Sequence, residues 1–230
     1  MSASTLQAFF SQAHAWTGAL ALITFWLASL SRKGSVCHRY AGRVFLLAML
    51  TVVLSAVPLS WAHWTRGNQA LAVFFFYLIL LVSFSGVSAW RAIRLRSDFA
   101  QYADRGFRIG AWVLGLSGLL VSVYGLLHSL PILMAFGAIG PITAYQWLKL
   151  AYRGPGDAQW WLRSHYGAML GIGMATHIAF LQIGLSRHLA GLGGPLITQL
   201  SWFGPLLVGF IATAVLNRRF RRPLAQRESA

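Results

Sequence analysis

The residues of this chain that could do chemistry in apolar surroundings are its histidines. The 230 residues include seven, and two of them, His14 and His177, lie within long apolar segments. An imidazole is costly in such surroundings unless a partner satisfies it. Two neutral imidazoles from different helices are the axial ligands of a low-spin haem b. The sequence therefore predicts that His14 and His177 bind haem iron, with His128 as a further candidate near the same end of the segments.

A second polar group lies at the opposite end of the segments. It combines two histidines with three arginines: His38, Arg39, Arg43, Arg163 and His165. Arginine pairs with carboxylates through its forked guanidinium. This group could therefore hold a second haem, the propionates of a haem or the carbonyl of a quinone. An anionic lipid headgroup and ordinary topological charge are the alternatives.

The apolar segments contain no carboxylate. The four acidic residues, Asp98, Asp104, Asp157 and Glu228, all fall in loops or in the tail. This disfavours ion-coupled transporters and proton pumps, which rely on buried carboxylates. A transition-metal carrier would suit the histidines, but it fits poorly with the lack of carboxylates and with a single cysteine. Phosphate-loop and dinucleotide motifs are also missing from the sequence.

Seven apolar segments must position these side chains. They cover residues 9–30, 40–61, 70–90, 109–130, 131–150, 162–185 and 196–216. Each is close to the roughly 20 residues that cross the hydrocarbon as a helix. The sequence thus predicts an all-α membrane protein, a seven-transmembrane helix bundle that forms a single domain over residues 1–230. Pro131 suits the first turn of a helix, and Pro141 and Pro205 are expected to kink theirs.

The basic residues give the orientation. With seven spans, 17 of the 19 Lys and Arg residues lie on one side, and only Arg66 and Arg187 on the other. Because basic loops stay in the cytoplasm, the N-terminus is expected outside and the C-terminus in the cytoplasm, in the bacterial inner membrane. The net charge of +15 then faces the anionic lipid bilayer, and no nucleic-acid partner is expected. Trp16, two residues from His14, is expected to line a pocket.

Two short motifs resemble a known family. The segment from His38 to Arg43 reads HRYAGR, and Arg163-Ser-His165 begins a later segment. Together with His14, they resemble a bacterial family of predicted multi-spanning membrane proteins, domain of unknown function 2306, whose signature is HR-x-x-GR. The resemblance implies that these residues form the site. The two levels of histidines are also loosely similar to those of cytochrome b561-type proteins.

These features favour a b-type cytochrome that passes electrons between a quinone and a redox partner protein. The alternative is a non-redox membrane module, namely a small-solute carrier, a lipid-binding protein or an assembly subunit, with its basic site on the cytoplasmic side. Whether the chain is an enzyme stays open.

Overall fold

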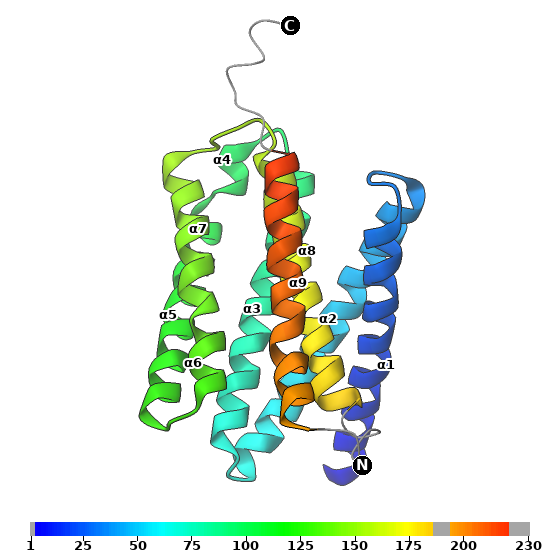
Figure 1. Cartoon of the computed structure of the whole chain (residues 1–230), viewed down its shortest axis with the longest axis vertical. Helices are drawn as coiled ribbons and strands as arrows, with labels where there is room; N and C mark the ends of the chain where they lie inside the picture. Colours follow the sequence, from blue (N-terminus) through cyan, green and yellow to red (C-terminus); the bar gives the residue numbers. More distant parts are fainter. Residues whose placement is uncertain (1–2, 186–193, 221–230) are drawn as a thin grey trace, which may run out of the picture. The chain divides into compact units, whose positions relative to one another are not determined.

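The computed structural model describes residues 3–185 and 194–220. All regular structure in these residues is helical (Figure 1). The elements are α1 (Ala3–Leu30), α2 (Val36–Thr65), α3 (Gln69–Arg94), α4 (Phe99–Tyr102), α5 (Arg105–Leu127), α6 (Pro131–Gly137), α7 (Ile139–Arg153), α8 (Trp160–Ala179), the π-helical η1 (Phe180–Leu185) and α9 (Pro195–Arg219). His188, Arg187 and the arginines at 221, 222 and 227 lie outside the described residues.

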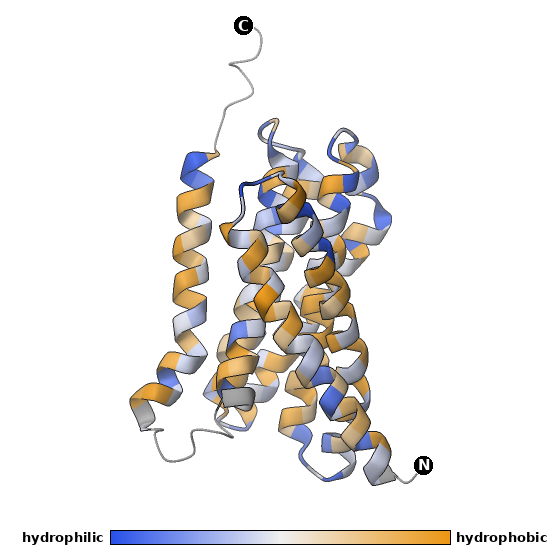
Figure 2. Ribbon diagram, turned by 90° about the vertical axis from the view of Figure 1, so that its right-hand side faces the viewer, coloured by the Kyte–Doolittle hydropathy of each residue, from blue (hydrophilic) through white to orange (hydrophobic). Residues whose placement is uncertain are grey.

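Five of the described helices, α1, α2, α3, α5 and α9, are long and apolar enough to cross a membrane. This confirms the prediction of an all-helical protein and indicates a membrane protein. Figure 2 shows hydrophobic residues along the helices and hydrophilic residues gathered mainly at helix ends and in connecting loops.

The two remaining predicted segments are each built from shorter pieces. Residues 131–150 form α6 and most of α7, and residues 162–185 form most of α8 and all of η1. Pro131 begins α6, as predicted. α6 ends at Gly137, four residues before Pro141, because a proline ring clashes with the carbonyl at that distance and offers it no N–H. Pro141 therefore accompanies a helix break instead of a kink, whereas α9 continues across Pro205.

The chain forms two compact units. Unit 1 comprises Met1–Asn68 and Leu170–Ala212, and unit 2 comprises Gln69–Met169 and Thr213–Ala230. The helices α8 and α9 therefore contribute residues to both units. The expectation of a single domain stays a prediction.

In unit 1, α1 and α2 pack side by side in opposite directions (Figure 1). The ring of Phe25 on α1 lies 5.7 Å from that of Phe45 on α2. It also covers Gly173 of α8, where an added Cβ would come within 2.2 Å of the Phe25 ring. Gly209 of α9 accommodates Met174 in the same way, with 2.1 Å between such a Cβ and the sulfur. Small residues thus let these helices approach closely, as is typical of membrane bundles.

In unit 2, α5 packs against α6 and α7 where the helix break lies. A Cβ on Gly118 of α5 would come 2.5 Å from the carbonyl oxygen of Gly137. The buried hydroxyl of Tyr77 on α3 donates to the carbonyl of Phe136 at 3.1 Å and lies 3.4 Å from that of Gly137. Because Pro141 has no N–H for the Gly137 carbonyl, this hydroxyl helps to satisfy the broken end of α6.

A small buried cluster of aromatic residues and alanines forms where the loop between α3 and α5 meets the ends of the neighbouring helices. Its buried members are Ala92, Tyr102, Ala103, Phe107, Ala151 and Trp160. Asp104 accepts a hydrogen bond from the N–H of Phe107 and caps α5, and it pairs with Arg91 at 3.0 Å. Burial alone would raise the pKa of Asp104, but these two partners stabilise the carboxylate more strongly, and the net effect lowers its pKa.

The contact at Gly118 gives a stability prediction. We expect Gly118→Ala to destabilise the protein by about 1–3 kcal/mol, because the methyl group would meet backbone atoms of α6 and α7 that cannot move separately. The control is Gly171→Ala, at which an added Cβ meets nothing within 4 Å; it should be neutral or slightly stabilising. Thermal unfolding in detergent compares the two, and equal midpoints would contradict the close approach.

Candidate functional site

His14 lies half-buried on α1 and faces α2. Its Nδ1 lies 3.1 Å from the carbonyl oxygen of Val52 and 3.1 Å from Oγ of Ser55. A carbonyl oxygen only accepts, so Nδ1 carries the proton and donates it. The Nε2 atom therefore keeps its lone pair, and no hydrogen bond to it is found within residues 3–185 and 194–220. Such a nitrogen can bind a metal or accept a hydrogen bond.

His177 on α8 has partners at both ring nitrogens. Its Nδ1 lies 2.7 Å from the carbonyl oxygen of Gly173 and donates to it. Its Nε2 accepts a hydrogen bond from Nε1 of Trp26 at 2.9 Å. The rings of Trp26 and Phe25 pack edge-on against the imidazole at centroid distances of 5.6 and 5.4 Å. Metal ligation by His177 would require Trp26 to release Nε2.

The structure does not bring His14 and His177 together. Trp26, the partner of His177, follows His14 by twelve residues on α1, or about 18 Å of helix. The contacts on α2 show the same separation. Thr176, the neighbour of His177 in the chain, contacts Met49 (Oγ1 to sulfur, 3.5 Å), whereas His14 contacts Ser55, six residues further along α2. An iron between two imidazoles lies close to both nitrogens. Each imidazole alone has suitable donor chemistry for haem, but these two do not form a facing pair. Their predicted role as iron ligands stays a prediction.

His38 lies at the beginning of α2, where α1 ends. Its Nδ1 donates to the carbonyl of Ala28 at 2.9 Å, and Nζ of Lys33 donates to the same oxygen at 3.1 Å. Ala28 is in the last turn of α1, whose carbonyls have no partner within the helix. Arg39 donates to the carbonyl of Gly34 in the turn. His38 and Arg39 therefore hold the connection between α1 and α2, which gives the HRYAGR segment a structural role.

Two further members of the predicted basic group, Arg163 and His165, lie in unit 2. Nδ1 of His165 on α8 lies 3.1 Å from the carbonyl oxygen of Ala89 on α3 and donates to it. Arg163 pairs with Asp157, whose side chain is almost fully buried. The charge of Arg163 is thus already compensated within the protein. Arg43, by contrast, is exposed on α2 of unit 1.

His128 and Trp16 are both exposed on the surface of their helices. His128 is the C-cap residue of α5, exposed, with its ring 4.3 Å from that of Tyr124. Trp16 is 76% exposed, so the expectation that it lines a pocket within the protein is wrong. The indole that contacts a candidate histidine is that of Trp26.

A common arrangement links the histidines of the two predicted levels. In His14, His38, His165 and His177, Nδ1 meets a backbone carbonyl. Metal-binding histidines typically donate their second nitrogen in this way, which fixes the ring and leaves the other nitrogen basic. The described residues contain no cluster of three or more His, Cys, Asp or Glu side chains that could hold a metal ion. The arrangement therefore suits an imidazole acting alone or opposite one partner.

Sequence reasoning missed three partners of the candidate residues: Ser55, Trp26 and Asp157. Ser55 follows His14 by 41 residues, and Trp26 precedes His177 by 151. No local pattern connects such positions. Asp157 had a detectable signal, because it is a carboxylate six residues before Arg163 in a loop that is otherwise short of acids.

The tautomers can be tested directly. We expect nitrogen NMR of histidine-labelled protein at alkaline pH to show Nδ1-protonated rings for His14 and His38, because a carbonyl accepts from each. Signals are assigned by their loss in His14→Gln and His38→Gln. An Nε2-protonated ring at His14 would contradict the bond to Val52.

No family model matches this chain, and no curated protein and no solved structure matches it either. The resemblance carried by the HRYAGR segment stays a prediction. The function is therefore inferred from the residues of the chain and their contacts.

Proposed function

We propose that this chain is an integral membrane electron-transfer protein of the b-type cytochrome kind, linked to a quinone and to a redox partner protein. The observation that carries the proposal is His14. Its imidazole is held by Val52 and Ser55 through Nδ1, and Nε2 points its lone pair away from those partners. This is the state in which an imidazole binds iron. Haem b supplies a one-electron couple when it is bound.

In this proposal the histidines and arginines have separate roles. His14 would hold the haem iron through Nε2, and His128 and His177 are the further candidate ligands; His177 would first have to release its bond to Trp26. His38, Arg39 and Arg43 in unit 1, and Arg163 and His165 in unit 2, are the candidate residues for propionates or a quinone carbonyl. Arg39 and Arg43 suit this role better than Arg163, since Asp157 already neutralises Arg163.

The proposed topology has seven spans, with α6 and α7 as the fifth and α8 with η1 as the sixth. The protein lies in a bacterial inner membrane, with its N-terminus outside the cytoplasm and its C-terminus inside it. The distribution of Lys and Arg supports this orientation, since short basic loops are retained in the cytoplasm.

A non-redox membrane module is the second candidate. It is favoured by the contacts of His177 and His38, which satisfy imidazole nitrogens within the protein. In that case the imidazoles connect helices, and the basic residues bind an anionic headgroup or a small anionic solute.

Visible spectroscopy separates the two candidates. We expect the protein, expressed with ample haem and purified in mild detergent, to show a Soret band and a sharp α band after reduction by dithionite. His14→Ala should abolish both bands because it removes an axial ligand. His63→Gln, at the end of α2, is the matched control and should keep them.

Three outcomes decide against parts of this proposal. A colourless wild-type protein would favour the non-redox module. Full bands in both His14→Ala and His177→Ala would overturn the assignment of these histidines. Loss of the bands in His63→Gln would mean that the spectrum reports general stability.

The only cysteine tests the orientation. Cys37 is exposed at the beginning of α2, so a membrane-impermeant maleimide should label it in inverted vesicles and spare it in intact spheroplasts. The variant Cys37→Ser/Asn68→Cys moves the thiol to the connection between α2 and α3 and should reverse the result. Labelling of Cys37 in spheroplasts would invert the proposed topology.

A further inference from the structure

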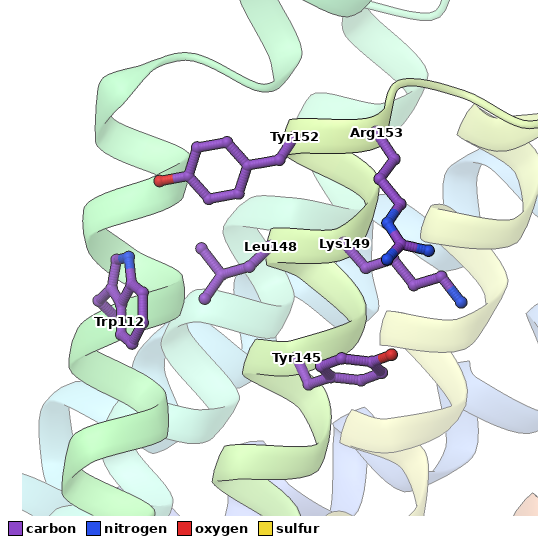
Figure 3. Close-up of a pocket in the computed structure, with 6 residues that line it drawn as sticks. All are labelled: Trp112, Tyr145, Leu148, Lys149, Tyr152 and Arg153. Atoms are coloured by element: carbon purple, nitrogen blue, oxygen red, sulfur yellow. The ribbon is translucent and has the colours of Figure 1, made fainter.

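A groove in unit 2 has no histidine among its lining residues. It runs between α5 and α7 and has a volume of about 300 Å³. Its lining residues are Trp112 from α5 and Tyr145, Leu148, Lys149, Tyr152 and Arg153 from α7 (Figure 3). The five residues of α7 are spaced by three and four positions and therefore form one stripe of the helix. Aromatic and basic side chains alternate along this stripe.

One side of the groove carries positive charge that no described carboxylate compensates: Lys149 and Arg153 point to one side of α7, and Leu148 and Tyr152 point toward Trp112 (Figure 3). Lys149 and Arg153 are one turn apart on α7 and both exposed. Each of the acidic residues within 3–185 is used elsewhere: Asp98 caps α4, Asp104 pairs with Arg91, and Asp157 pairs with Arg163. The C-terminus of α7 attracts cations by itself, but this effect explains neither the aromatic rings nor the hollow between the helices.

Two tyrosines of the groove lie close to cations, one of which is Lys149. Nζ of Lys149 lies 5.9 Å from the centroid of the Tyr145 ring, and the guanidinium of Arg108 lies 5.2 Å from that of Tyr152. Cations within about 6 Å of a ring face are attracted to it. Tyr145 and Tyr152 are each 63% exposed. Amphipathic rings in such positions are typical of the headgroup level of a membrane.

The rest of the groove is apolar. Trp112 and Leu148 form its sides, and the surface continues along α5 and α7 through the exposed side chains of Ile109, Leu116 and Ile142. A small inorganic anion would not contact this apolar surface. A molecule with a phosphate at one end and a hydrocarbon chain at the other matches both parts.

We propose that this groove binds one anionic phospholipid. Its phosphate lies between Lys149 and Arg153, where the arginine fork can donate two hydrogen bonds. An acyl chain follows Trp112 and Leu148 along α5 and α7. The charge of the groove selects anionic over zwitterionic lipid, and its apolar side distinguishes a lipid from inorganic phosphate. This site is independent of any haem.

Lipid titration of the delipidated full chain, followed by native mass spectrometry, tests the proposal. The probes are phosphatidylglycerol and phosphatidylcholine with identical acyl chains. We expect one phosphatidylglycerol to bind about tenfold more tightly than phosphatidylcholine, since the choline cation of the latter is repelled by Lys149 and Arg153 and offsets their attraction for its phosphate. Lys149→Gln/Arg153→Gln should remove this preference. Arg94→Gln/Arg96→Gln loses the same charge from the end of α3 and the residues that follow it, and it should keep the preference.

Further measurements distinguish a lipid held in the groove from general attraction to a basic surface and from binding of phosphate alone. Trp112→Leu, which changes no charge, should weaken phosphatidylglycerol binding if an acyl chain follows the groove. Equal losses in the two double variants would overturn the site in favour of general attraction to a basic surface. Equal binding of both lipids, or complete displacement of phosphatidylglycerol by millimolar inorganic phosphate, would also overturn it. Unchanged elution of all variants from a sizing column confirms that each is folded.

Discussion

In the hydrocarbon of a bilayer no water reaches the polar groups of a protein, so the protein must satisfy them itself. The helices do this for most of the backbone. The hydroxyls of Thr17, Thr24 and Ser60 donate to the carbonyl four residues earlier in the same helix. The imidazoles follow the same rule, and His14 donates through Nδ1 to a carbonyl of the neighbouring helix. This requirement fixes its tautomer and leaves Nε2 as the nitrogen available for chemistry.

The same requirement explains unit 2 where its helical hydrogen bonding is interrupted. Pro141 cannot donate to the carbonyl of Gly137, and Tyr77 brings a hydroxyl to that point. Small residues then let α5 and α7 touch: an added Cβ on Gly115 would come 2.9 Å from Cβ of Ala144. One turn along, the larger Trp112 and Leu148 line the groove instead. The change from small to large side chains along one helix pair thus gives both a tight contact and a hollow.

The few acidic residues of the chain are all used within the described structure to cap helices or to pair with arginines, apart from Glu228, which lies outside it. The sequence has 19 basic and four acidic residues, and the acidic residues described in the structure cap helices or pair with arginines near helix ends. The pKa of Asp104 is lowered by the hydrogen bond from the N–H of Phe107 and by the pairing with Arg91, which together outweigh its burial. Most of the Lys and Arg residues that the structure describes therefore pair with no carboxylate, and their charge can meet anionic headgroups at the membrane surface.

The sequence by itself determined that the chain forms long apolar helices and which side chains within them could do chemistry. Both depend on local properties, namely the length of an apolar run and the identity of the polar residues within it. The start of α6 at Pro131 followed for the same reason. The break at Ala138 between α6 and α7 did not, because a proline can be tolerated within a membrane helix, as in α9.

Only the tertiary structure decided which side chains meet. It placed Ser55 against His14 and Trp26 against His177, and it separated the two imidazoles that the sequence suggested as a pair. In water, an apolar stripe shows which face of a helix packs inward. In lipid, all faces of these helices are apolar, so the sequence carries no such stripe, and close packing between small and large side chains sets the order and the facing sides of the helices.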